Sequence, residues 1–201
     1  ASPVAADSER VRFVVIGDAG HASIIQGTIA RGVHRACDGD CDFIVMLGDN
    51  VYEEGIRDAN DEARLACIIK RYPSEHAYLV LGNHDYDIVT PSLERARNQL
   101  SWLRRDTADG GPEAHGGYHH FRFSAGPVDI VGLDTNHLVR TPSQADYPDL
   151  SRWLGRLKRK PGRWTLAMGH HPYASNGAHG NAGDYRDGGF ELWAGTYFGW
   201  F

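Results

Sequence analysis

The sequence predicts an α/β domain built in layers, with much of its strand pairing parallel. Five short and nearly continuous apolar runs recur along the chain, and stretches with helical periodicity lie between them. Such runs are typical of strands that are buried on both faces. Strands that alternate with helices are typical of parallel sheets covered by helices, so the two observations together indicate this fold class.

The strands are predicted from these runs and from one further segment. The five apolar runs are Val11–Ile16, Phe43–Leu47, Ala77–Leu81, Val128–Leu133 and Trp164–Met168. Gly116–Ser124 alternates more strongly between apolar and polar residues and contains aromatic side chains. We therefore expect this segment to form a strand near a sheet edge or in a second sheet.

Helices are predicted where apolar side chains recur at helical spacing. The three stretches are Ile25, Ile29, Val33 and Ala36; then Leu93, Ala96, Leu100 and Leu103; and finally Trp153, Leu154 and Leu157. The second stretch also carries a start signal, because Thr90 can act as the N-cap with Pro91 at the first helical position.

The bulk composition is that of one globular domain. The chain has 201 residues, of which 41% are hydrophobic, without a repeat of fixed period or a long Ser/Pro linker. This length can bury one sizeable core, so we expect a single domain over residues 1–201. The net charge of -5 gives no basic surplus for nucleic acid, and we expect no such partner. No apolar run approaches the roughly 20 residues that span a bilayer, so no membrane partner is expected either.

The N-terminus and the cysteines bear on the compartment. Residues 1–6 read ASPVAA, which suits the start of a mature chain after signal cleavage, so we expect a secreted or periplasmic location. Cys37 and Cys41 flank a short turn and can close a small disulfide loop in an oxidising compartment. A zinc-binding pair is the alternative, although no second Cys pair or zinc-finger-spaced His pair follows. Cys67 is expected to be a buried, small apolar side chain on a helix.

Polar side chains follow the predicted strands at the point where each strand ends. They are Asp18, Asp49, Asn50, Tyr52, Asn83, His84, Asp85, His170 and His171. Because ligands of such sheets bind beyond the carboxyl ends of the strands, we expect these side chains to converge at one sheet edge. Carboxylates, an amide oxygen, a phenol and imidazoles suit first-row transition ions better than calcium. Two metals in one site lie roughly 3.5–4 Å apart, and Asp49 is the natural bridging carboxylate.

The order of the motifs carries more information than any single motif. GDAG, GDNVY, GNHD and GHHP follow one another along the chain, each after an apolar run. In this order they resemble the calcineurin-like metallophosphoesterase superfamily. Tyr52, three residues after Asp49, resembles the tyrosine that marks purple acid phosphatases, and the loop Ser175–Gly180 is also similar to that family. The resemblance runs from about Val11 to about Gly180 and implies a layered metallophosphoesterase-type βαβ sandwich.

The resemblance implies two metal ions and assigns their ligands. Asp18 and Tyr52 would hold one metal, expected to be ferric iron, and Asp49 would bridge. Asn83 and His170 would hold the second metal, which would be iron, zinc or manganese. The two ions would orient the phosphate and lower the pKa of a bound water, so that metal-bound hydroxide attacks phosphorus in line.

The same resemblance implies the remaining roles. His84 would donate a proton or a hydrogen bond to the leaving-group oxygen, and Asp85 would orient His84. Asn83 and His179 would contact a small phosphorylated substrate, whereas His171 is expected to pack beside the site. The expected function is therefore acid phosphatase activity on phosphomonoesters. A phosphodiesterase of the same superfamily is an alternative that Tyr52 argues against, and a non-catalytic metal- or phosphate-binding protein is another.

The family pattern has one further element that this sequence lacks. A late Gly-His-x-His motif supplies one ligand to each metal in the family, and no histidine follows His179 here. We favour the interpretation that the chain is a fragment, with the C-terminal part of the family domain absent. Two alternatives stay open. The chain is a truncated form whose aromatic tail, residues 191–201, packs on the sheet or on a partner, or the site is completed by His179, by His21 or by a second subunit.

Overall fold

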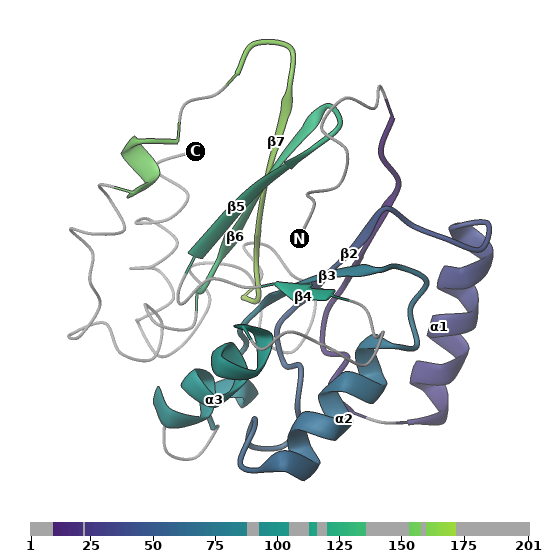
Figure 1. The fold of residues 1–201 in the computed structure, drawn as a ribbon, viewed down its shortest axis with the longest axis vertical. Helices are drawn as coiled ribbons and strands as arrows, with labels where there is room; N and C mark the ends of the chain where they lie inside the picture. The colour runs from purple at the N-terminus through teal and green to yellow at the C-terminus, as the bar shows by residue number, and fades with distance from the viewer. Residues whose placement is uncertain are drawn as a thin grey trace, which may run out of the picture.

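Two β-sheets lie at the centre of the protein, seen here in a computed structural model (Figure 1). The structure describes residues 10–21, 23–87, 93–104, 113–115, 120–135, 153–157 and 160–171. Within these ranges the first sheet has the order β1-β2-β3-β4 and the second the order β5-β6-β7. The strands are β1 (Phe13–Ile16), β2 (Phe43–Leu47), β3 (His76–Val80), β4 (Glu113–His115), β5 (His120–Ala125), β6 (Val128–Leu133) and β7 (Trp164–Gly169).

The strand pairing is largely parallel, as the sequence predicts. Neighbouring strands of the first sheet are all parallel, and so are β6 and β7, whereas β5 and β6 are antiparallel. The five apolar runs all form strands whose bounds lie within two residues of those predicted. The aromatic segment contributes β5 and lies in the second sheet, which is one of the two expected positions. Strand β4 was not predicted.

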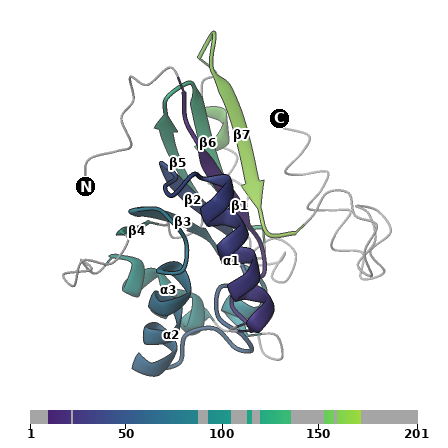
Figure 2. The same cartoon turned by 90° about the vertical axis from the view of Figure 1, so that its right-hand side faces the viewer.

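Helices cover one face of the first sheet, and the second sheet covers the other (Figures 1 and 2). The helices are α1 (Ile24–Ala36), α2 (Ala59–Ile69), α3 (Leu93–Arg104) and the short 3-10 helix η1 (His84–Tyr86). Strand β2 shows how the layers are built, because its side chains alternate. Ile44 and Met46 belong to the core shared with the helices, whereas Phe43 and Val45 belong to the core shared with the second sheet.

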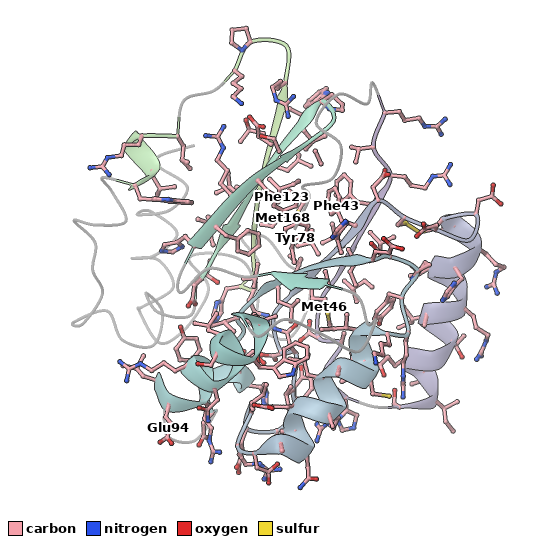
Figure 3. All side chains as sticks on the ribbon, in the orientation of Figure 1. Phe43, Met46, Tyr78, Glu94, Phe123 and Met168 are labelled. Carbon is pink, nitrogen blue, oxygen red and sulfur yellow. A yellow bond between two sulfur atoms is a disulfide. The ribbon has the colours of Figure 1, made fainter. Side chains whose placement is uncertain are left out.

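Aromatic rings fill much of the space between the two sheets. Phe43, Tyr78, Phe123 and Met168 gather there, whereas Met46 lies on the helix side of the first sheet (Figure 3). The Tyr78 and Phe123 rings stack with centroids 3.6 Å apart, and the Phe43 ring meets Phe123 edge-on at 5.1 Å. Burial of large rings is a major source of core stability, so these contacts hold the two sheets together.

Burial on both faces is confirmed for β2 and β6 but is wrong for β1 and β7. All six residues of β6 are buried, whereas β1 and β7 are mostly half-exposed. Trp164 of β7 is 72% exposed and Val15 of β1 is 41% exposed. The reason is position, because β1 and β7 lie at sheet edges within the described residues.

Two predicted helices, α1 and α3, form where the sequence places them. Helix α1, however, packs on the sheet through other residues than expected. Ser23 caps α1 by accepting a hydrogen bond from the Gln26 backbone N–H at 3.2 Å. The side of α1 that faces the sheet carries Gln26 and Ala30, whereas Ile25 and Ile29 are 72% and 49% exposed. Helix α3 begins at Leu93, and the expected cap at positions 90 and 91 lies outside the described residues.

Helix α2 confirms that Cys67 lies on a helix, although the bounds of this helix were not predicted. Its start signal is present in the sequence. Asp58 accepts hydrogen bonds from the backbone N–H groups of Asn60 and Asp61, as an N-cap does. Leu65 and Ile68 are buried under the first sheet. The expectation that Cys67 is buried is wrong, because Cys67 lies on the exposed side of this helix.

The structure also describes three further features. Cys37 and Cys41 form a disulfide, so the zinc alternative does not apply to this pair. Residues 153–157 form a helical turn, where Arg156 and Leu157 donate backbone hydrogen bonds to the third residue before each. Among the described residues, no helix combines the length and the apolar character that crossing a bilayer requires. A single domain over residues 1–201 stays a prediction.

One buried carboxylate stabilises the second sheet at the end remote from the polar strand-end motifs. Asp129 on β6 is fully buried and accepts hydrogen bonds from Ser124, Arg122 and Arg163. Burial opposes ionisation of Asp129, but the hydrogen bonds from Ser124 and the two arginines overcome it and lower the pKa to about 2. The ionised carboxylate therefore stabilises the folded state.

We predict that Asp129→Asn destabilises the protein in a pH-dependent way. A folded pKa below the unfolded value means that this stabilisation is present above about pH 4 and is lost as the pH falls through about 2. Since one pKa unit corresponds to about 1.4 kcal/mol, the pH-dependent part is about 2 kcal/mol. Urea unfolding with a chelator present should show a lower free energy of unfolding than wild type at pH 7, and a much smaller difference near pH 2. Asp40→Asn, on an exposed turn, is the control, and a difference that does not shrink at low pH contradicts the account.

Candidate metal centre

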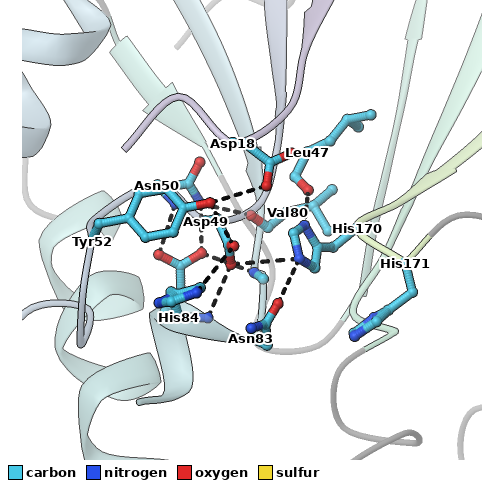
Figure 4. Close-up of polar contacts among 12 residues, drawn as sticks. Asp18, Leu47, Asp49, Asn50, Tyr52, Val80, Asn83, His84, His170 and His171 are labelled. Atoms are coloured by element: carbon cyan, nitrogen blue, oxygen red, sulfur yellow. Dashed lines mark hydrogen bonds and ion pairs between the residues drawn. The ribbon is translucent and has the colours of Figure 1, made fainter. Parts of the chain in front are cut away.

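The predicted ligands converge, but they come from two sheets rather than from one sheet edge. Asp18 and Asp49 follow β1 and β2, Asn83 follows β3, and His170 follows β7 of the second sheet (Figure 4). Ligand atoms of Asp18, Asp49 and His170 all lie within 4.8 Å of one another. The expectation of one sheet edge is therefore wrong. The site lies where the carboxyl ends of the parallel strands β1 and β2 meet those of the parallel strands β6 and β7.

The two carboxylates sit on strained turns. Asp18 and Asp49 have φ angles of 56° and 53°, in the left-handed region that side chains other than glycine rarely adopt. Such a backbone costs of order 1–3 kcal/mol for each residue and is concentrated at functional sites. Asp18 donates its backbone N–H to the Gly48 carbonyl at 3.2 Å, so the two turns are also bonded to each other.

The Asp49 carboxylate lies between two groups of possible ligands (Figure 4). On one side, the Tyr52 hydroxyl donates to Asp49 Oδ2 at 2.8 Å and lies 3.0 Å from Asp18 Oδ1. On the other side, Asp49 Oδ1 lies 3.5 Å from His170 Nε2. One oxygen of Asp49 therefore faces Tyr52 and Asp18, and the other faces His170.

The His170 ring presents a lone pair to oxygen atoms. Its Nδ1 lies 2.9 Å from the Leu47 carbonyl, which only accepts, so Nδ1 carries the proton. In the neutral ring Nε2 then carries a lone pair, and it lies 2.8 Å from Asn83 Oδ1. Nε2 and Oδ1 are then both acceptors, and a proton or a cation between them relieves the repulsion of their lone pairs. A ligating histidine usually donates its other N–H to a carbonyl or carboxylate, so His170 is arranged as a metal ligand.

The Tyr52 hydroxyl lies between two carboxylates, whose negative charge favours a proton or a cation beside them. Burial raises the pKa of Tyr52 far above its usual value, and the carboxylates of Asp49 and Asp18 raise it further. Without a cation the phenol therefore stays protonated. A metal ion held by Tyr52 and the two carboxylates would compensate their charge and would take the place of the phenol proton.

His84 faces the site through one ring nitrogen. Its Nδ1 lies 2.7 Å from the Glu53 carbonyl, and its Nε2 lies 3.9 Å from Asp49 Oδ2. The ring also packs against Tyr52 with a centroid separation of 4.4 Å. The Glu53 carbonyl fixes the proton on Nδ1, which leaves Nε2 to act toward the site.

Asp85 does not orient His84, contrary to our expectation. Its buried carboxylate accepts backbone N–H groups from Gly82 at 2.8 Å, Asn50 at 3.0 Å and Val51 at 3.2 Å, and the Asn50 side-chain amide at 2.9 Å. Burial raises the pKa of Asp85 to about 8, although the backbone donors oppose this shift. Asp85 thus joins the loop after β2 to the loop after β3, and the Glu53 carbonyl takes the orienting place beside His84.

The sequence-based predictions concern three further histidines, namely His171, His21 and His179. The His171 ring lies 5.0 Å from the His170 ring, so it packs beside the site as expected, and its Nδ1 lies 2.8 Å from Thr135 Oγ1. His21 meets the Tyr52 ring edge-on at 5.8 Å. His179 lies outside the described residues, so its substrate-binding role stays a prediction.

Several functional groups escaped prediction because they are backbone atoms or glycines. The carbonyls of Leu47 and Glu53 orient the two histidines, and any residue type can supply a carbonyl. Gly82 is different, because a Cβ there would lie 2.3 Å from both the backbone N and Oδ1 of Asp49. The glycine before Asn83 was the signal that could have indicated this close approach.

We predict that Gly82→Ala abolishes tight metal binding while leaving the sheets folded. The added methyl overlaps Asp49 and must push its carboxylate out of place. Gly17→Ala is a matched control, since Gly17 also precedes a candidate ligand but its Cβ would meet only Leu47 Cβ at 4.0 Å. Titration calorimetry with Zn²⁺ should show binding weakened at least ~10–100-fold in the first variant only, with unchanged far-UV circular dichroism. Equal affinities in the two variants contradict the assigned place of Asp49.

Comparison with known proteins relates this chain to a family of phosphoesterases. A family profile described as calcineurin-like phosphoesterase matches residues 11–196. Purple acid phosphatase 7 of Arabidopsis thaliana is 29% identical over 195 residues, which is 84% of this chain and 55% of that protein. Purple acid phosphatase 17 of the same plant is 31% identical, over 85% of this chain and 54% of that protein. Tartrate-resistant acid phosphatase type 5 of Rattus norvegicus is 27% identical, over 87% and 60%.

A solved structure supports the fold. The protein described as GAP50, the anchor in the inner membrane complex of Plasmodium, superposes with a TM-score of 0.58 at 17% identity, over 91% of this chain and 62% of that one. At this identity the likeness concerns the fold alone. The chain spans about half the length of the plant relatives it matches. With the profile match covering most of its length, the chain belongs to the calcineurin-like phosphoesterase family, and within it resembles the purple acid phosphatases.

Proposed function

We propose that this protein is an acid phosphatase of the purple type, which hydrolyses small phosphomonoesters at a two-metal site. The observation that carries the proposal is the position of Asp49, whose two oxygens face Tyr52 on one side and His170 on the other. A carboxylate in this position suits two ions roughly 3.5–4 Å apart. The similarity to several acid phosphatases supports phosphate esters as the substrate class.

The described residues fit two different ions. Asp18 and Tyr52 would hold a ferric ion, because a phenolate is a hard, anionic donor that stabilises a trivalent ion. Asn83 and His170 would hold iron, zinc or manganese, ions that accept mixed oxygen and nitrogen donors. When bound, the two metals would supply charge neutralisation at the phosphate and an activated water.

His84 supplies the proton that the leaving group needs. The Glu53 carbonyl holds Nδ1–H, so the imidazolium form presents its second proton on Nε2, on the side of Asp49. Donation from Nε2 to the ester oxygen avoids an unstable alkoxide as the bond to phosphorus breaks. General acid catalysis of this kind contributes typically ~10²–10⁴-fold. Asn83 would contact the phosphate as well as a metal.

A secreted or periplasmic location is part of the proposal. The Cys37–Cys41 disulfide supports it, because disulfides persist in oxidising compartments and are rare in the reducing cytosol.

We predict that Tyr52→Phe removes the visible colour of the iron-loaded protein. The phenolate is the donor for the charge-transfer band, so its loss should bleach the band while metal analysis still finds metal at the second position. Tyr78→Phe is the control, because Tyr78 stacks between the sheets, and this variant should keep its colour. A wild-type protein that is colourless with iron bound and prefers a phosphodiester supports the alternative enzyme. A wild-type protein that holds two metals and turns over neither ester class supports the non-catalytic alternative.

We predict that His84→Gln acts mainly on esters with poor leaving groups. Loss of the general acid should lower kcat for an alkyl phosphate by ~10²–10⁴-fold and change KM little, because the proton is needed only as the bond breaks. A nitrophenyl phosphate needs less protonation, so its kcat should fall much less. His34→Gln, on the exposed side of α1, is the control. An equal loss of kcat for the two esters would show that His84 does not protonate the leaving group.

A further inference from the structure

Arg64 on α2 joins the two loops that carry Asp18 and Tyr52. Its Nη2 donates to the Gly20 carbonyl at 3.3 Å and also to the Tyr52 carbonyl, at a shorter separation. Gly20 lies two residues after Asp18, so one guanidinium group contacts the loop of each ligand expected at the ferric position. Hydrogen bonds from a charged donor are stronger than those between neutral groups.

The two loops are packed so closely that their relative position is sensitive. Gly20 donates its backbone N–H to the Asp49 carbonyl at 2.8 Å. A Cβ on Gly20 would lie 2.5 Å from that carbonyl oxygen and 2.6 Å from the backbone N of Val51. Since Asp18 and Asp49 also adopt left-handed backbone, the loops need contacts from outside to keep this arrangement.

The helices supply these contacts through anchored side chains. The buried Asp61 carboxylate lies 4.0 Å from Arg64 Nη1 and holds Arg57 through Nε at 2.8 Å. From α1, the buried Gln26 amide donates to the Ala19 carbonyl, and Arg71 in turn donates to Gln26 Oε1 at 2.5 Å. Side chains of α1 and α2 therefore hold carbonyls in the loop of Asp18. Of these side chains, Arg64 also contacts the loop of Tyr52.

We propose that Arg64 is a positioning residue, which fixes Tyr52 against Asp18 and so shapes the first metal position. The inference deepens the proposed function and rests on it for the identity of the metal. The placement of the loops does not depend on that identity, because Arg64 contacts backbone carbonyls of the loops and none of the ligand atoms.

The test compares Arg64→Met with Arg57→Met in the full chain. Arg57 shares the Asp61 carboxylate, but among the described residues it donates no hydrogen bond to Gly20 or Tyr52, so it controls for a general loss of stability at the start of α2. Arg64→Lys, which keeps the charge but loses the planar fork of N–H groups, replaces the methionine variant if that one does not fold.

Two measurements apply to each variant. Hydrogen exchange of the chelated protein reports the loops themselves, and we expect faster exchange in residues 17–21 and 50–56 of the Arg64 variant with little change in β2. Fe³⁺ and Zn²⁺ titrations report the site, and we expect Fe³⁺ affinity to fall ~10–100-fold with a shifted visible band. Exchange and affinity equal to wild type overturn the proposal, and so does an equal effect of Arg57→Met. If wild type takes up no iron, the proposed function fails, and the exchange of the chelated protein still decides the role of Arg64.

Discussion

The buried carboxyl group of Asp85 makes the hydrogen bonds on which the geometry of the site depends. It accepts hydrogen bonds from Asn50 and Val51 after β2 and from Gly82 after β3. These bonds fix the distance between the loop of Asp49 and the loop of Asn83. Loss of this hydrogen-bonded buried carboxyl group would leave several backbone donors unsatisfied, each at a cost of about 1–3 kcal/mol. The strained backbone at Asp49 is held in place by this network.

Polar contacts among the described residues also join the second sheet to the first near the site. His170 bonds the Leu47 carbonyl of the first sheet, and the Tyr86 hydroxyl bonds Asp134, which follows β6. His170 is also a candidate metal ligand, so the contact that joins the sheets places a ligand nitrogen beside Asp49. Rings such as Phe43 and Phe123 provide the apolar part of this contact further from the site. Sheet packing and ligand geometry therefore depend on each other.

The sequence predicts the type of site well because the ligands follow strands. An aspartate or histidine directly after a buried run must lie at the carboxyl end of its strand, whatever the rest of the fold. The sequence does not predict which sheet a strand joins. The apolar runs of β2 and β7 look alike, although β7 lies in the other sheet. Nor does it predict which neighbour a side chain contacts. His84 and Asp85 are adjacent in sequence, yet the first faces Glu53 and the second faces the loop after β2. Arg64 gave no signal either, because its partners are carbonyls.

The central claim is that Asp49 bridges two metal ions, and X-ray absorption at the metal edges tests it most directly. Protein loaded with iron and zinc should hold two ions per chain, and the fine structure should show a metal–metal separation of roughly 3.5–4 Å. Asp49→Asn, which removes the bridging charge, should lose that feature. A single isolated ion in wild type, or two ions without a short separation, would contradict the account.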